Sequence, residues 1–118
     1  MNHLSINYQK VLSLIQVSLE KKGRLPNSAK LLAVTKKQTV QSIVELFQLG
    51  QTYFSENYVQ EWKEKKETIK TLYPNFPIRW HFTGRIQTNK VKYLIEEIEL
   101  FHSIDRLELA EKMNQVAK

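Results

Sequence analysis

The sequence predicts an α/β fold with a parallel sheet, and three observations support this prediction. Short apolar runs alternate along the chain with segments of helical periodicity, which favours right-handed β-α-β crossovers. No glycine-rich dinucleotide fingerprint follows the first apolar run. A polar residue also follows or ends each predicted strand, as at the mouth of a (β/α)8 barrel. These polar residues are Lys36, Asn57, Thr83 and Asp105. The pattern leans towards a barrel over an open doubly wound sheet, and neither periodicity nor spacing decides between them.

The N-terminal elements follow from the spacing of apolar residues. Residues 8–19 carry apolar side chains at helical intervals, and Gly23 is suited to end that helix. The run LLAVT at 31–35 is short and continuous, as in a strand covered on both faces. A second helix is predicted over 40–47 and is ended by Gly50.

The rest of the chain continues the same alternation. After the third helix, Pro74 and Pro77 prevent further helix. A fifth helix begins close to the end of the sequence. The predicted elements are a strand at 52–57, a helix at 59–69, a strand at 78–84, a helix at 91–98, a strand at 100–105 and a helix at 109–116.

Composition bounds the class of protein. The 118 residues fit a single domain spanning 1–118. The chain has no cysteine, which excludes a disulfide framework and a thiolate metal site and suits a reducing cytoplasm. No stretch approaches the roughly 18 apolar residues of a membrane span. The net charge of +6 could attract phosphates, including those of nucleic acid, but a solvated surface is the commoner reason for it.

Lys36 is the first candidate for chemistry because it directly follows a predicted strand. A lysine amine that is desolvated becomes a nucleophile and can form a Schiff base with a carbonyl compound. The alternative is that Lys36 is a solvated loop residue, which is the commoner case. Lys37 is expected to be solvated, since successive side chains alternate between faces.

Asn57 and His81 are the other candidates. The Asn57 amide could donate to a ligand oxygen such as a phenolate, or it could cap the helix that follows. Glu56 is either a helix-start charge or the partner of a cation. Alternation places His81 opposite Trp80 and Phe82, where it contacts a ligand ring or serves as a hydrogen-bonded core residue. No second histidine or carboxylate stands at ligand spacing from it, so no metal site is expected.

Four segments occur in a distinctive order along the chain. They are LLAVTK at 31–36, FSENYVQE at 54–61, RWHFTGRIQTNK at 79–90 and FHSIDR at 101–106. Together they closely resemble the pyridoxal-phosphate homeostasis protein family. The resemblance extends from about Lys10 to Met113. It implies a small cytoplasmic protein that binds pyridoxal 5'-phosphate (PLP) in a barrel like that of alanine racemase.

The resemblance also implies roles for the candidate residues. Lys36 matches the lysine that forms a Schiff base with the C4′ aldehyde of PLP. Asn57 matches the residue beside the cofactor's phenolic oxygen, and His81 matches a third-strand position facing the cofactor mouth. Lys37 departs from the family pattern, in which the second lysine lies one place later. Ser55 stands where a glycine is common.

The implied function is PLP binding and homeostasis without turnover, so no catalytic residue is expected. A racemase-type PLP enzyme is the alternative, and it would need a second acid/base that no residue here clearly supplies. Expected partners are PLP and PLP-dependent apo-enzymes. Neither nucleic acid nor a membrane is expected as a partner.

Length separates this chain from the family pattern. Family members form a complete eight-stranded barrel of roughly twice this length, so the chain resembles the N-terminal half of a (β/α)8 TIM-type barrel. The phosphate-binding loops of such barrels follow the last strands, which this sequence lacks. Open sheet edges and an exposed barrel interior predict self-association. A truncated fragment without cofactor binding is the remaining alternative.

Overall fold

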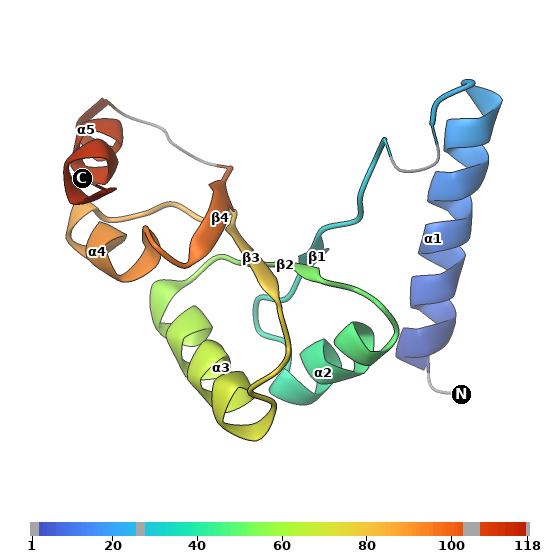
Figure 1. Cartoon of the computed structure of the whole chain (residues 1–118), viewed down its shortest axis with the longest axis horizontal. Helices are drawn as coiled ribbons and strands as arrows, with labels where there is room; N and C mark the ends of the chain where they lie inside the picture. The colour runs from blue at the N-terminus through green and yellow to red at the C-terminus, as the bar shows by residue number, and fades with distance from the viewer. Residues whose placement is uncertain (1–2, 26–27, 103–106, 118) are drawn as a thin grey trace.

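The computed structural model describes residues 3–25, 28–102 and 107–117. Four parallel strands form one sheet in the order β1-β2-β3-β4 (Figure 1). The strands are β1 (Ala33–Val34), β2 (Tyr53–Glu56), β3 (Arg79–Phe82) and β4 (Ile98–Phe101). The helices are α1 (His3–Lys21), α2 (Val40–Gln48), α3 (Val59–Leu72), the 3-10 turn η1 (Thr88–Lys90), α4 (Val91–Leu94) and α5 (Leu107–Ala117). The predicted parallel α/β fold is therefore confirmed.

The order of the strands bears on the choice between barrel and open sheet. A doubly wound sheet reverses its strand order at a switch point. Here every strand pairs with its neighbour in the sequence, with no reversal among the described strands. Sequential parallel pairing is the arrangement of a (β/α)8 barrel.

The ends of α2 illustrate how local sequence fixes an element. The Thr39 hydroxyl accepts a hydrogen bond from the Ser42 amide at 3.1 Å, which caps the first turn. Gly50 follows the helix with φ of 108°, a conformation that side chains disfavour. Its amide donates to the Phe47 carbonyl at 2.9 Å and so closes the end of the helix. The predicted limits of this helix are confirmed to within one residue.

The fourth helix and strand lie elsewhere than predicted. The apolar spacing predicted a helix over 91–98, but α4 ends at Leu94 and Ile98 begins β4. Ile98 pairs with Trp80 of the neighbouring strand and is buried there. The apolar residues up to Ile98 have helical spacing by chance, and burial of Ile98 against the sheet makes this residue part of a strand. Asp105, the predicted end of this strand, lies outside the described residues.

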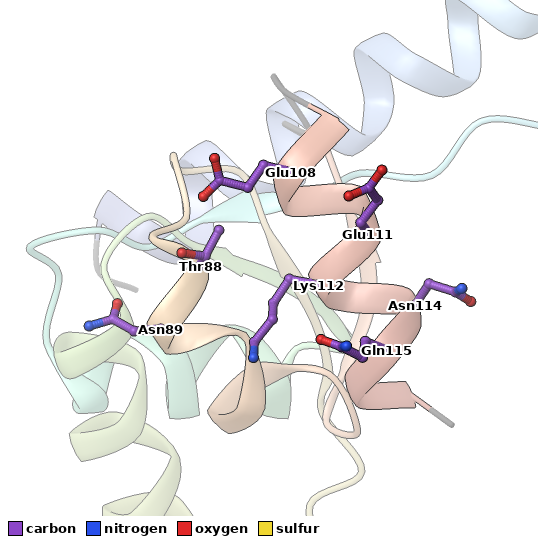
Figure 2. A pocket seen from close by; sticks show the side chains of 7 residues that line it. All are labelled: Thr88, Asn89, Glu108, Glu111, Lys112, Asn114 and Gln115. Atoms are coloured by element: carbon purple, nitrogen blue, oxygen red, sulfur yellow. The ribbon is translucent and has the colours of Figure 1, made fainter.

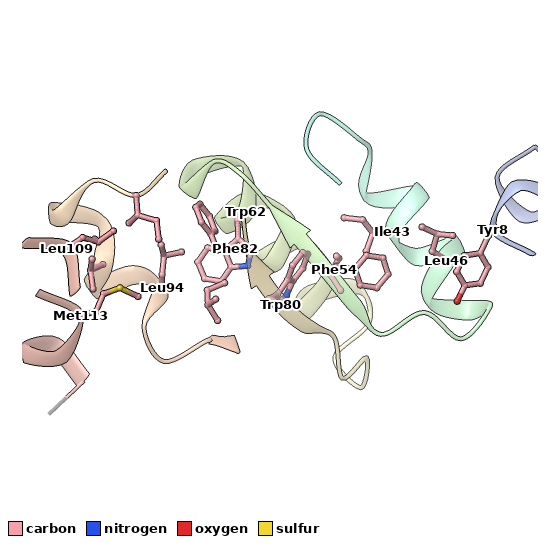
Figure 3. Close-up of a cluster of buried hydrophobic side chains, with 14 residues drawn as sticks. Tyr8, Ile43, Leu46, Phe54, Trp62, Trp80, Phe82, Leu94, Leu109 and Met113 are labelled. Carbon is pink, nitrogen blue, oxygen red and sulfur yellow. The ribbon is translucent and has the colours of Figure 1, made fainter. Parts of the chain in front are cut away.

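The core forms an elongated band along the helix side of the sheet (Figure 3). Phe54, Trp80 and Phe82 point from the strands towards α2 and α3, and Trp62 of α3 meets them fully buried. Leu94 and Met113 continue the band towards α4 and α5. The helix-facing side of each strand therefore supplies the packing.

The other face of the sheet is open among the described residues. Val34 of β1 and Leu100 of β4 are each 50% exposed, so the expectation that the first strand is covered on both faces was wrong. The surface of 8019 Å² exceeds the roughly 6700 Å² expected for a compact protein of this mass. The radius of gyration is 16.0 Å against about 13.5 Å expected. The large surface and the large radius of gyration both fit a sheet whose second face has no cover among the described residues.

No helix in the described part of the chain is both long and apolar enough to cross a membrane.

Candidate functional site

Lys36 lies in the turn that joins β1 to α2. The Gln38 amide donates to the Thr35 carbonyl at 3.0 Å and closes this turn. Lys37 adopts φ of 59°, in the left-handed region. Both lysine side chains are exposed, as predicted for Lys37. The described chain therefore presents the Lys36 amine to solvent instead of desolvating it.

The parallel register brings the predicted site residues to one edge of the sheet. Val34 pairs with Ser55, and Ser55 pairs with His81. Two residues further along their strands, Lys36 and Asn57 follow at the next level of the same side. Lys36 and Asn57 therefore lie at the carboxyl ends of adjacent strands, and His81 lies one level lower.

A chain of hydroxyl groups holds the Asn57 side chain. The Ser55 hydroxyl donates to Thr83 Oγ1 at 2.9 Å, and Thr83 donates to Asn57 Oδ1 at 2.5 Å. The bond from Thr83 occupies the Asn57 amide oxygen and leaves the NH2 group as the donor for another partner. The N-cap of α3 is Tyr58, so the interpretation of Asn57 as the helix cap was wrong. The supporting Ser55 and Thr83 hydroxyls were not predicted.

Gly84 packs directly against the backbone that carries Asn57. A Cβ at this position would lie 2.1 Å from the Asn57 carbonyl oxygen. Real side chains do not approach backbone this closely, so any other residue at position 84 must displace Asn57 or the end of β3.

We therefore expect Gly84→Ala to destabilise the chain by about 1–3 kcal/mol, because overpacking forces a backbone shift. Urea denaturation measures this loss, and the NMR signals of the Asn57 side-chain amide report its displacement. Gly23→Ala is the control for the Asn57 signal: its φ of 65° makes alanine unfavourable there, but no atom lies within 4 Å of the added Cβ, so Asn57 should not move. An unchanged Asn57 signal in Gly84→Ala would contradict the steric argument.

His81 belongs to a polar cluster on the open face. Its Nδ1 lies 3.0 Å from His102 Nε2, and its Nε2 lies 3.3 Å from Glu99 Oε2. The side chain lies opposite the buried Trp80 and Phe82, so the predicted orientation is confirmed. The sequence shows no second histidine or carboxylate at ligand spacing from His81, but the pairing of β3 with β4 brings His102 and Glu99 beside it in space. Within the described residues, no group of three or more such side chains could hold a metal ion.

Glu99 is also bound by Arg79, whose guanidinium contacts its carboxylate and the Tyr53 hydroxyl. The hydrogen bond from Arg79, with a smaller one from His81, holds the pKa of Glu99 below its usual value. The open face beside the candidate site is therefore charged and hydrogen-bonded towards β4.

The turn that carries Lys36 rests on a buried ionic cluster that was only partly foreseen. The cluster consists of Glu56, Glu61 and Lys65. Glu56 is fully buried, and its carboxylate accepts from Lys65 Nζ at 3.0 and 3.1 Å. The interpretation of Glu56 as the partner of a cation is confirmed. Lys65 stands in the charged run KEKKE at 63–67, yet its side chain is buried. Burial raises the pKa of Glu56, and hydrogen bonds from Thr35 and Lys65 oppose that rise.

A separate pocket of about 630 Å³ lies between η1 and α5 (Figure 2). Acidic, basic and amide side chains line it, and none of Lys36, Asn57 and His81 is among them. The lining residues are Thr88, Asn89, Glu108, Glu111, Lys112, Asn114 and Gln115. The candidate site is thus the strand-end edge and not this pocket.

Comparison with known proteins gives consistent matches. The chain is 41% identical over 114 residues to the pyridoxal phosphate homeostasis protein of Vibrio alginolyticus, covering 97% of this chain and 49% of that protein. It is 43% identical over 108 residues to the protein of the same name in Aquifex aeolicus, covering 92% of this chain and 46% of that protein. The chain is similar to the N-terminal half of the pyridoxal phosphate homeostasis proteins. The resemblance stated from the sequence is confirmed.

Comparison with solved structures gives a consistent result for the fold of this chain. PipY of Synechococcus elongatus, solved with PLP bound, is 33% identical and superposes with a TM-score of 0.71. The match covers 90% of this chain and 48% of PipY. A protein of unknown function from Bifidobacterium adolescentis superposes with a TM-score of 0.86 at 27% identity, covering 97% of this chain and 49% of the other. The prediction of half a (β/α)8 barrel is confirmed.

Two facts limit what these matches show about the chain. The chain spans about half the length of the curated relatives it matches. No protein-family model matches the chain.

Proposed function

We propose that this chain binds PLP through a reversible Schiff base on Lys36, as part of a cytoplasmic protein that maintains the PLP pool. The PLP-bound state of the similar PipY carries most of the proposal. The names of the relatives from Vibrio and Aquifex support it. PLP, when bound, supplies an aldehyde that condenses with an amine and releases one water molecule.

The residues at the strand-end edge fit this cofactor. Lys36 presents an exposed amine beyond β1. Asn57, its amide oxygen occupied by Thr83, has an NH2 group to donate towards the phenolic oxygen. His81 lies on the open face one level below, where we propose that it contacts the cofactor. Its present partners are His102 and Glu99.

We propose that the function is binding and delivery, with PLP-dependent apo-enzymes as recipients and without a turnover reaction. A racemase-type enzyme is the alternative. It requires a second acid/base on the cofactor face opposite Lys36. Exchange of the α-proton of an amino acid in the presence of PLP, lost in Lys36→Ala, would favour the racemase.

The central test is a PLP titration followed by visible absorption, borohydride reduction and peptide mapping. We expect the reduced cofactor on Lys36, and we expect Lys36→Ala to abolish the specific band. Lys37→Ala is the matched control, because the neighbouring side chain is equally exposed, and it should retain the band. Equal labelling of many lysines would instead favour a fragment without a cofactor site.

We further propose that the open face of the sheet drives self-association. Val34 and Leu100 lie on this face half exposed, and β1 and β4 are edge strands in the described sheet.

Sedimentation velocity at micromolar concentration should therefore detect dimers or larger species, and Leu100→Lys should shift the chain towards monomer by placing a charge on that face. Leu72→Lys is the control, because this residue is 62% exposed at the end of α3 on the helix side. A sharply monomeric wild-type chain would contradict the proposal.

A further inference from the structure

The backbone on both sides of Lys36 is held by the helix α3. A residue's backbone has two soft dihedrals, and the two peptide units that flank its Cα fix them. The first unit carries the Thr35 carbonyl, and the second carries the Lys37 amide. Both groups hydrogen-bond to side chains of α3.

Lys65 holds the first peptide unit. Its Nζ donates to the Thr35 carbonyl at 2.6 Å and to Glu61 Oε1 at 2.7 Å. It is also bound to Glu56, and only 8% of its side chain is exposed. A buried ammonium with three acceptors has little freedom to move, because it would have to leave one of them unpaired.

Glu61 holds the second peptide unit. Its Oε1 accepts a hydrogen bond from the Lys37 amide, and the same oxygen accepts from Lys65. The hydrogen bond from Lys65 keeps the pKa of Glu61 below its usual value, so the carboxylate is ionised at neutral pH. An ionised acceptor makes the stronger bond to a backbone amide.

The hydrogen bond from the Lys37 amide to Glu61 also explains an unusual backbone conformation. Lys37 has φ of 59°, a region that favours glycine and disfavours lysine. A residue keeps such a conformation when its surroundings determine it. The Lys37 amide bonded to Glu61 and the Gln38 amide bonded to the Thr35 carbonyl provide that determination.

We propose that Glu61 and Lys65 are positioning residues for Lys36. In the described contacts they bind the backbone on either side of Lys36, and so they fix the turn from which the Lys36 amine projects. The inference deepens the proposed function and rests on it for the role of Lys36. A turn held in one conformation presents the amine in one direction, which favours attack on a bound aldehyde.

Glu61→Ala is the variant that tests this proposal. Glu61 is 26% exposed, so its removal is compatible with a folded chain, whereas Lys65 is buried beside Glu56. Glu64→Ala is the matched control, because Glu64 is exposed on the same helix and its side chain bonds only to Gln60 in the described contacts. Glu61→Gln is the conservative variant, since its amide oxygen can still accept from Lys37.

Two measurements are made on each variant. Amide hydrogen exchange of Lys37 and Gln38 reports the turn in the absence of PLP, with the Ile43 and Phe54 amides as references for global opening. Borohydride trapping of PLP on Lys36, followed by peptide mapping, reports the reaction of the amine. We expect Glu61→Ala to accelerate exchange at Lys37 about tenfold without changing the reference amides. We expect it to reduce trapping at Lys36 about fivefold.

Glu61→Gln should restore most of both values, and Glu64→Ala should change neither. Unchanged exchange at Lys37 in Glu61→Ala would overturn the proposal, and so would faster exchange with undiminished trapping. If the wild-type chain traps no PLP on Lys36, the proposed function fails. The exchange data then decide separately whether Glu61 holds the turn.

Discussion

Replacing Lys65 by methionine is expected to destabilise the chain by about 3–5 kcal/mol, since it leaves the Glu56 carboxylate buried without its cation. Glu56 is fully buried, and Lys65 Nζ bonds to both of its carboxylate oxygens. Methionine has a similar length, so the effect reports loss of charge more than loss of volume. Urea denaturation at pH 7 measures the loss.

Lys70→Met is the control for this variant. Lys70 is also paired with a glutamate, Glu97, at 3.2 Å, but 62% of its side chain is exposed. Exposed pairs contribute less than about 1 kcal/mol, so this substitution should change little. Similar losses for both variants would contradict the importance assigned to burial.

The pH dependence of the same variant follows from the pKa of Glu56. Burial raises this pKa above the unfolded value even with Lys65 present, and removal of the ammonium raises it further. A carboxyl with a raised folded pKa lowers stability above its unfolded pKa and has no such effect once protonated in both states. The deficit of Lys65→Met relative to wild type should therefore shrink as the pH falls towards about 4. A constant deficit would show that the buried carboxylate is not its cause.

The sequence contained the signals for most of the elements. Thr39 before an apolar stripe and Gly50 after it mark the limits of α2, and both act locally. The same reasoning failed at Ile98, where helical spacing competed with pairing to Trp80 in β3. Pairing depends on residues about twenty positions away, which periodicity does not contain.

In the candidate site, too, features set by local sequence could be predicted and features set by packing between distant segments could not. Lys36 and Asn57 could be predicted because each follows a strand, and parallel strands end at one edge. Lys65 lay within a run of charged residues, and its burial depends on how α3 sits against β1 and β2. The spacing of Glu61 and Lys65 by four residues was a signal for an ion pair, but not for its contact with the Lys36 turn.

A second large effect is expected for Trp62→Ala, which should cost about 3–5 kcal/mol because it opens a cavity in the middle of the core band. Trp62 is fully buried and lies beside Phe82 in the band (Figure 3), with Lys66 Nζ 4.5 Å from the centroid of its ring. The core of the described residues lies on one side of the sheet only, so few neighbouring side chains can move into the cavity left by Trp62. Thermal and urea denaturation measure the loss.

Trp62→Phe separates the packing of the ring from its polar atom. In the described part of the chain, Trp62 Nε1 is buried without a hydrogen-bond partner, so phenylalanine removes an unsatisfied donor together with some volume. These effects oppose each other, and the net cost should be less than half that of Trp62→Ala. Tyr93→Ala, at an aromatic residue that is 41% exposed, is the surface control and should stay within about 1 kcal/mol of wild type. Equal losses for Trp62→Phe and Trp62→Ala would contradict this account, because a phenyl ring keeps most of the packing that alanine removes.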